Sequence, residues 1–486
     1  MVSSLIFKSI ERFSVKGLGL IVSIVLARLL SPDEFGQVAI ITVFVNLCYT
    51  FVESGLNTAL IQSKKVDKVD YSTVFYISFA VAFLLAGVLV IIAPFVGRLY
   101  DNPALVLPLQ VYSASLLVSA YHSIQTAKLQ KEMKFKLILY TSLASTFLAG
   151  AIGIIMAYKG AGIWALIGYY FSYNIINVLL VLILDRWMPC LKFSVKRAKE
   201  LFAYGWKMLV SGLLCTLYGD IRTLIIGKMF SENKLGYYNR GQQFPVLVSG
   251  TVESTVFSVV FPAISKVQDK KDEVIKLMRN SLKIGSFILM PLMAGLCATA
   301  TPLFTVLLTE KWLPAVPYMQ IICIGSANVA IMVSCLTAIK SIGRSDVYMK
   351  LEAVRRIAMI GVLLISVFVF KTVEAIAWGF AISAWIDIAI ISVPTKRLFS
   401  YGLFAQIKDV WKIIVASAAM FGIVFAIGFI SLPAWALLML QIPAGVVSYA
   451  AICFVLRVDC MRDMMAKILK RRGGGTPCEA SEADAG

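Results

Sequence analysis

Apolar residues run along this chain in long stretches, and short segments between them carry most of the charge. Each stretch holds about 20 residues, which lets a helix cross a hydrocarbon core of about 30 Å at 1.5 Å per residue. The pattern predicts an all-α polytopic membrane protein with fourteen transmembrane helices, at approximately residues 8–30, 35–61, 74–97, 105–127, 138–158, 162–184, 203–228, 244–265, 284–308, 318–339, 355–370, 373–395, 411–431 and 433–456.

The composition agrees with a chain that lies mostly in lipid. Hydrophobic residues make up 59% of it and charged residues 15%, whereas soluble domains carry about 25% charged residues. The first apolar stretch has no small-residue cleavage site after it and is followed by further spans, so we expect a retained helix and not a signal peptide.

The net charge of +19 is compatible with nucleic-acid binding or with membrane topology, and the placement of the 46 Lys and Arg residues separates the two. With a cytoplasmic N-terminus, 35 of them fall in cytoplasmic segments, including five in residues 340–356, eight fall on the opposite side and three inside spans. This asymmetry follows the positive-inside rule. We therefore expect a bacterial inner-membrane protein with both termini cytoplasmic and no nucleic-acid partner.

The sequence contains an internal repeat with an offset of 200 residues. Residues 19–54 match residues 219–254 at nine of 36 positions, and the matches include Ser31 with Ser231, Gly36 with Gly236 and Glu53 with Glu253. The offset covers six predicted helices, an even number, so both copies enter the membrane from the same side and form a parallel repeat. Two six-helix lobes followed by two C-terminal helices are the expected arrangement.

The repeat predicts five regions along the chain. They are an N-lobe of helices 1–6 (1–190), a cytoplasmic amphipathic linker (191–202), a C-lobe of helices 7–12 (203–398), helices 13 and 14 (399–460) and a disordered cytoplasmic tail (461–486). A plain solvated linker is the alternative for residues 191–202.

Four cations lie in or near the first helix of each lobe, namely Arg12, Lys16, Lys207 and Arg222. A charged group inside a span costs at least about 2.5 kcal/mol, so each should face a cavity or a partner. These cations are candidate ligands for a phosphate or pyrophosphate group. The alternative is structural, with Asp220 neutralising Arg222 or Lys16.

The remaining ionisable groups predicted inside spans are fewer. Glu53 and Glu253 are equivalent by the repeat, and they are either structural carboxylates or a site for a coupling cation or proton. Asp220 belongs to the same group of coupling or structural carboxylates. His122 is a candidate proton site or a hydrogen-bonded packing residue, and the same two interpretations apply to Asp387.

The motifs of energy-consuming and hydrolytic chemistry are missing from the sequence. It contains no P-loop, no Gly-x-Ser-x-Gly and no His/Asp cluster with metal-ligand spacing. We expect no enzyme activity, no cofactor and no metal, and a driving force that comes from an ion gradient, the membrane potential or the gradient of the substrate.

Five segments carry a family resemblance: Ala27 to Gly36, Ser54 to Leu56, Asp220 to Gly227, Leu235 to Tyr238, and Phe261 to Lys266. With them, residues 5–460 resemble the Wzx-type polysaccharide flippases of the multidrug/oligosaccharidyl-lipid/polysaccharide exporter superfamily. The resemblance implies a bilobed, V-shaped fold of fourteen helices.

The same resemblance implies a function. Such a protein moves an undecaprenyl-pyrophosphate-linked oligosaccharide repeat unit across the inner membrane by alternating access, for export of a surface polysaccharide such as lipopolysaccharide or capsule. Cations in its cavity hold the pyrophosphate, which agrees with the interpretation of Lys16, Lys207 and Arg222. The implied partners are the lipid-linked oligosaccharide, membrane lipids, and the polysaccharide polymerase and glycosyltransferases of the same pathway.

Two other functions fit the same architecture less well. An ion-coupled multidrug or small-molecule exporter that takes cations should have an apolar or acidic cavity, whereas the buried basic residues favour an anionic substrate. A membrane-bound polymerase or ligase needs a sizeable extracytoplasmic loop, and the longest one here, about Met229 to Gln243, has some fifteen residues.

Overall fold

In the computed structural model of the protein, residues 2–53, 56–63 and 66–462 are described, and side chains are described except at 2–13, 58, 62, 204, 207 and 345. Throughout this part of the chain the regular structure is helical, as predicted, and it contains no strand. Nearly all of the predicted tail (461–486) lies outside the described residues.

The described chain divides into two compact units, Met1–Asn239 and Arg240–Gly486, which we describe separately. The division falls inside α10. The first unit contains α1 (Val2–Leu29), α2 (Pro32–Glu53), α3 (Leu56–Gln62), α4 (Lys68–Leu99), η1 (Pro103–Leu105), α5 (Val106–Ser113), α6 (Ser115–Lys131), α7 (Phe135–Tyr158), α8 (Ile163–Asp185), α9 (Val195–Met229) and the start of α10 (Glu232–Ser265).

The second unit continues α10 and is also helical. It contains α11 (Lys271–Ala298), α12 (Ala300–Leu307), η2 (Glu310–Ala315), α13 (Val316–Ser326), α14 (Val329–Ser341), α15 (Ser345–Ile365), the π-helical turn η3 (Ser366–Phe370), α16 (Val373–Phe399), α17 (Leu403–Ile427) and α18 (Ala434–Val455). This division does not test the predicted lobe and linker boundaries at residues 190 and 203, which stay predictions.

Within the described residues, 13 helical segments are long and apolar enough to cross a membrane. The predicted count of fourteen adds α1, which has 28 residues and side chains described only from Ser14 onward. The number fourteen therefore stays a prediction, while the polytopic helical class is confirmed.

The repeat is visible in how α2 and α10 begin. Ser31 precedes α2, where its Oγ accepts a hydrogen bond from the Glu34 amide at 3.3 Å while Glu34 Oε2 accepts one from the Ser31 amide at 2.6 Å, which is a capping box. In the second copy, Ser231 Oγ accepts a hydrogen bond from the amide of Lys234 at 3.2 Å. The same residue type thus starts both helices, 200 positions apart.

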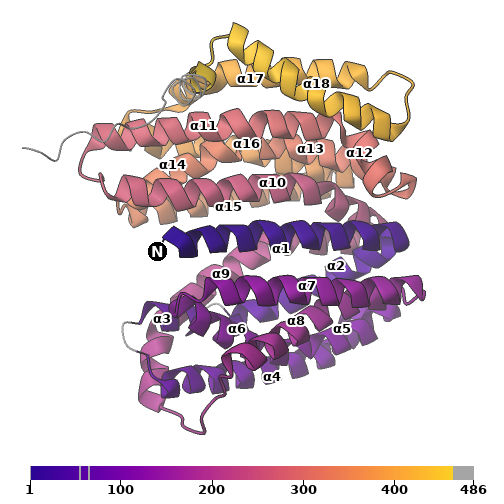
Figure 1. Ribbon diagram of the computed structural model, residues 1–486, viewed down its shortest axis with the longest axis vertical. Coiled ribbons are helices and arrows are strands. Elements are labelled where there is room, and N and C mark those ends of the chain that lie inside the picture. The colour runs from indigo at the N-terminus through magenta and orange to yellow at the C-terminus, as the bar shows by residue number, and fades with distance from the viewer. Residues whose placement is uncertain (1, 54–55, 64–65, 463–486) are drawn as a thin grey trace, which may run out of the picture. The chain divides into compact units, whose positions relative to one another are not determined.

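Small residues on α7 allow close helix packing in the first unit. A Cβ placed on Gly150 would lie 2.5 Å from Cγ2 of Val22 on α1, and one on Gly153 would lie 2.9 Å from Cβ of Tyr169 on α8. In lipid, small residues on a shared face let helix backbones approach and gain van der Waals contact. Helix α7 therefore packs against both α1 and α8 (Figure 1).

The predicted linker begins α9. Ser194 Oγ caps α9 by accepting from the amide of Arg197 at 3.4 Å, and Arg197 binds Asp70 on α4 with Nε–Oδ1 and Nη2–Oδ2 distances of 2.7 and 2.8 Å. Two parallel hydrogen bonds between a guanidinium and a carboxylate fix the relative orientation of the two side chains and also stabilise the ion pair. Residues 195–202 are thus the first turns of α9, held to the start of α4.

Helix α17 is attached to α11 by a carboxylate. Asp409 accepts hydrogen bonds from Nε and Nη2 of Arg279, each at 2.7 Å, and from the hydroxyl of Tyr401 at 2.7 Å. Burial, and then this hydrogen bond, raise the pKa of Tyr401, so its phenol stays protonated as the donor. In Figure 1, α17 and α18 lie beside α11 within the second unit.

Candidate functional site

A row of polar contacts joins α2 to α9 in the first unit. The hydroxyls of Thr50 and Thr216 lie 3.0 Å apart, and one turn further along each helix the carboxylate of Asp220 has the Asn46 side chain as its hydrogen-bond partner. Helices α2 and α9 are antiparallel at this contact. Residues one turn apart on each helix therefore form successive pairs, Thr50 with Thr216 and Asn46 with Asp220. The amide of Asn46 is therefore a partner of Asp220, and the alternative in which Asp220 neutralises Arg222 or Lys16 stays a prediction.

Arg222 lies beside this row and contacts aromatic side chains. Its Nη2 is 3.5 Å from the hydroxyl of Tyr218, and its guanidinium carbon lies 5.7 Å from the centroid of the same ring. Tyr238 on α10 is 2% exposed and lies near enough to interact electrostatically with Arg222. A guanidinium that lies over an aromatic ring is preorganised to bind an anion through two of its N–H donors.

Lys16 is an exposed residue of α1. It lies about 20 Å from the start of a helix with a rise of 1.5 Å per residue, which puts it near the middle of a membrane-spanning length. Among the described residues, Lys16 has no ion-pair partner. A cation without an acidic partner at this depth is available for an anionic ligand.

The other two predicted cations are placed only by their backbones. Arg12 lies on α1, one turn before Lys16, and Lys207 lies on α9. Their side chains are outside the described residues. No described contact joins Lys16 to Arg222, and the predicted grouping of the four cations stays a prediction.

The two repeat-related carboxylates differ in their helical positions. Glu53 is the last residue of α2, whereas Glu253 lies inside α10, which continues to Ser265. Both side chains are exposed, and neither has an ion-pair partner within the described chain. Their role, structural or coupling, stays a prediction.

His122 lies on α6 in the first unit and is half-buried. Its Nε2 is 3.4 Å from the hydroxyl of Thr126, one turn further along.

Another polar group in this unit, around Tyr49, was not singled out in the sequence. Its hydroxyl donates to Ser115 Oγ at 2.7 Å and accepts from Asn174 Nδ2 at 3.2 Å. Asparagine inside an apolar span is the signal that would have indicated such a network.

The first turns of α2 and α10 cross at two glycines. A Cβ on Gly36 would lie 1.9 Å from the carbonyl oxygen of Glu232, and one on Gly236 would lie 2.0 Å from that of Pro32. Both glycines are buried. The contact is reciprocal because each glycine lies against the first residue of the helix that holds the other.

Polar groups surround this crossing. Asn233 Nδ2 donates to Asp33 Oδ2 at 3.0 Å, and Glu232 accepts from Gln37 Nε2 at 2.8 Å and from Asn102 Nδ2 at 2.6 Å. We call the two glycines and these hydrogen bonds the outer clasp, because the Lys and Arg distribution predicts that this end faces away from the cytoplasm. The clasp holds α2, α10 and the segment after α4 together within the first unit.

A buried ion pair lies in the second unit, between α15 and α16. Arg355 Nη2 is 2.9 Å from Asp387 Oδ2, and the same guanidinium also pairs with Glu352. Arg355 and Asp387 are 7% and 2% exposed. The sequence pattern counted Arg355 with the cytoplasmic segment 340–356 and began a span at the same residue, and in the structure Arg355 lies in the middle of α15. Pairing with Asp387 lowers the cost that the charge of Arg355 would have inside a span.

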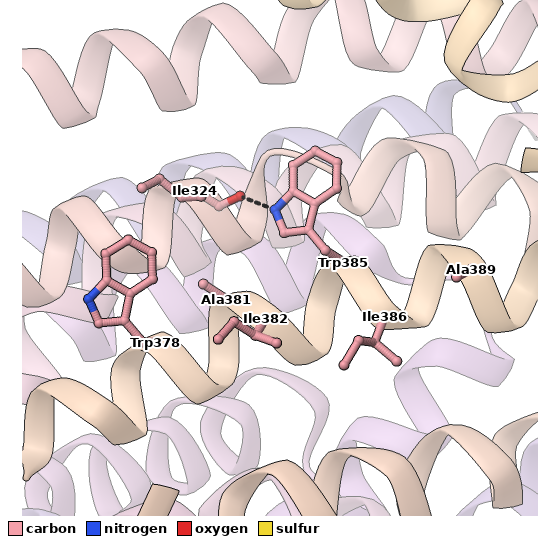
Figure 2. A pocket seen from close by; sticks show the side chains of 7 residues that line it. All are labelled: Ile324, Trp378, Ala381, Ile382, Trp385, Ile386 and Ala389. Carbon is pink, nitrogen blue, oxygen red and sulfur yellow. Dashed lines mark hydrogen bonds between the residues drawn. The ribbon is translucent and has the colours of Figure 1, made fainter. Parts of the chain in front are cut away.

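An apolar groove lies along the first half of α16. Its volume is about 410 Å³, and its walls include Trp378, Ile382 and Trp385 of α16 with Ile324 of α13. Figure 2 shows the two indole rings on one side of α16, with Trp385 Nε1 donating to the carbonyl oxygen of Ile324 at 3.3 Å. Such a surface suits a hydrocarbon chain.

Comparison with solved structures identifies the fold of the protein. An inward closed conformation of the lipid II flippase MurJ matches with a TM-score of 0.76 and 16% identity, over 96% of this chain and 100% of that one. An inward-facing multidrug resistance MATE transporter of the MOP superfamily matches with a TM-score of 0.60 and 12% identity, over 81% and 100%. The chain therefore has the same fold as these two proteins.

The sequence profile of the polysaccharide biosynthesis protein family matches residues 25–317, and the chain belongs to that family. The succinoglycan biosynthesis transport protein ExoT of Rhizobium meliloti (strain 1021) is 24% identical over 80% of this chain and 79% of its own length. The teichuronic acid biosynthesis protein TuaB of Bacillus subtilis (strain 168) is 23% identical over 88% and 89%.

The lipopolysaccharide biosynthesis protein WzxC of Escherichia coli (strain K12) is 22% identical over 65% of each chain. These matches confirm the predicted resemblance to polysaccharide exporters. ExoT is named as a transport protein and MurJ as a flippase, which supports the expectation of a membrane transporter rather than an enzyme.

Proposed function

We propose that this protein moves an oligosaccharide linked to undecaprenyl pyrophosphate from the cytoplasmic to the outer leaflet of the bacterial inner membrane, for export of a surface polysaccharide. The observation that carries the proposal is Lys16, a cation at mid-span whose charge has no acidic partner in the described chain. A pyrophosphate supplies the missing negative charge. Relatives named for succinoglycan, lipopolysaccharide and teichuronic acid biosynthesis support the saccharide.

The proposed binding residues differ in how they contact a pyrophosphate. Lys16 and Lys207 act as point charges, with Arg12 closer to the start of α1, and Arg222 offers a planar fork that tyrosine rings orient. The lipid tail stays in the bilayer, outside the headgroup site.

Transport by alternating access requires that the outer end open and close. The outer clasp supplies a closed arrangement made of hydrogen bonds and one tight glycine crossing, which are short-range contacts that a small separation removes. Release of the saccharide then requires that α2 and α10 part at this crossing.

The experiment is translocation of a labelled undecaprenyl-pyrophosphate oligosaccharide in proteoliposomes. We expect Lys16→Ala and Arg222→Ala to reduce the rate at least tenfold with unchanged protein yield, because each removes a charged hydrogen bond from the headgroup. Lys159→Ala is the matched control, since Lys159 is an exposed cation at the end of α7.

Two outcomes would contradict the proposal. Full activity in both variants would remove Lys16 and Arg222 from the pyrophosphate site. Absence of oligosaccharide transport, together with ion-dependent efflux of cationic dyes, would identify the protein as a multidrug exporter of the same fold.

A further inference from the structure

A second groove, separate from the residues above, lies between the start of α15 and the end of α16. Its volume is about 620 Å³, and it is lined by polar residues at one end and by apolar residues such as Val354, Ile390 and Val393 along its length. The polar end lies where α15 begins and α16 ends, at the boundary of both spans. The apolar part extends about three turns into them.

The charge of the polar end is positive and only partly compensated. Arg344 binds Asp346 through two hydrogen bonds of 2.9 Å, so these two residues neutralise each other. Lys350 and Arg397 also line the groove. Both are exposed, and neither has an ion-pair partner in the described part of the chain. The groove thus carries two uncompensated positive charges above an apolar wall.

We propose that this groove binds one anionic phospholipid of the surrounding bilayer. Lys350 and Arg397 contact the lipid phosphate, and an acyl chain lies against Val354 and Val393. Exposed apolar side chains continue this surface toward the membrane centre, with Val354 52% and Ile357 71% exposed. Basic pockets between membrane helices on the cytoplasmic side recognise anionic lipid headgroups by the same combination.

The apolar wall decides the source of the phosphate. A free phosphate ion would gain nothing from Val354, Ile390 and Val393, whereas a phospholipid can lay an acyl chain against them and gain van der Waals contact. The Lys and Arg distribution predicts that the polar end faces the cytoplasm, where anionic headgroups attract basic residues at about 1 kcal/mol each. The proposal does not depend on the substrate that the protein transports.

The test is native mass spectrometry of the full-length protein released from nanodiscs that contain phosphatidylglycerol and phosphatidylcholine. We expect the wild type to retain one phosphatidylglycerol, and the double variant Lys350→Ala/Arg397→Ala to bind it about 30-fold more weakly. The matched control is Lys276→Ala/Lys408→Ala, which removes two exposed cations outside the groove and should retain the lipid.

A second variant, Val393→Trp, fills the apolar part without changing charge and should also lose the lipid. Equal retention by the wild type and the double variant would overturn the proposal, as would equal loss in the control. Displacement by excess inorganic phosphate would identify a phosphate site instead. Displacement by a lipid-linked oligosaccharide would assign the groove to the transported substrate.

Discussion

Gly36 and Gly236 occupy equivalent positions in the internal repeat, and each lies against the backbone that starts the other's helix. The separations that an added Cβ would have, 1.9 Å from the carbonyl oxygen of Glu232 and 2.0 Å from that of Pro32, are far below van der Waals contact. Both obstacles are backbone atoms, which cannot rotate away as a side chain does. The crossing therefore requires glycine on both helices.

We predict that Gly36→Ala and Gly236→Ala each destabilise the protein by about 1–3 kcal/mol through overpacking. The measurement is the thermal unfolding midpoint in detergent. Gly87→Ala is the control, because nothing lies within 4 Å of a Cβ at that helical position, and alanine there should be neutral or slightly stabilising. Unfolding midpoints of all three variants equal to that of the wild type would contradict the reciprocal crossing.

The outer clasp predicts that a crosslink stops transport. Asp33 Oδ2 and Asn233 Nδ2 are 3.0 Å apart, so a short bifunctional thiol reagent should join cysteines at these two positions in a variant whose nine native cysteines are replaced. We expect the crosslinked Asp33→Cys/Asn233→Cys protein to lose oligosaccharide translocation and to recover it when the link is cleaved. Each single-cysteine variant, treated identically, is the control, and undiminished transport by the crosslinked protein would mean that α2 and α10 need not part.

The buried pair of Arg355 and Asp387 predicts an unequal response to single and double substitution. Removing one partner leaves an unpaired buried charge, so Arg355→Met or Asp387→Leu should cost about 3–5 kcal/mol. Replacing both, in Arg355→Met/Asp387→Leu, leaves apolar groups that pack together and should restore most of the stability. Thermal unfolding of the three variants completes the double-mutant cycle. Additive losses would show that the two side chains do not act as a pair.

The attachment of α17 to α11 predicts a smaller effect. Asp409→Asn weakens the two hydrogen bonds from Arg279 and the one from Tyr401, so we expect a loss of about 1–3 kcal/mol in thermal unfolding. Glu273→Ala is the comparison, because its pair with Lys270 is exposed, with side chains 49% and 70% accessible, and such pairs contribute about 0–1 kcal/mol. Equal losses in the two variants would mean that Asp409 is no more than a surface pair.

Much of the fold follows from local properties of the sequence. Apolar length predicts the spans because a helix must cover the hydrocarbon core with its own hydrogen bonds satisfied. The 200-residue repeat aligns Ser31 with Ser231, and the helices after both serines begin one residue later. Helix α15 begins at Ser345, ten residues before the span predicted at 355–370, because apolar length locates the membrane-crossing part of a helix and not its first turns.

The sequence by itself determined the membrane class, the exporter family and a short set of ionisable residues inside spans, because these depend on residue types and their spacing. The tertiary structure decided which partner each charged group has: Arg355 pairs with Asp387, Asp220 has a hydrogen bond with the Asn46 side chain, and Lys16 has no described ion-pair partner. Compensation depends on which helices are neighbours. For the same reason, Gly36 and Gly236 were visible as a repeat, while the contact that requires them became evident only when α2 and α10 were seen to cross.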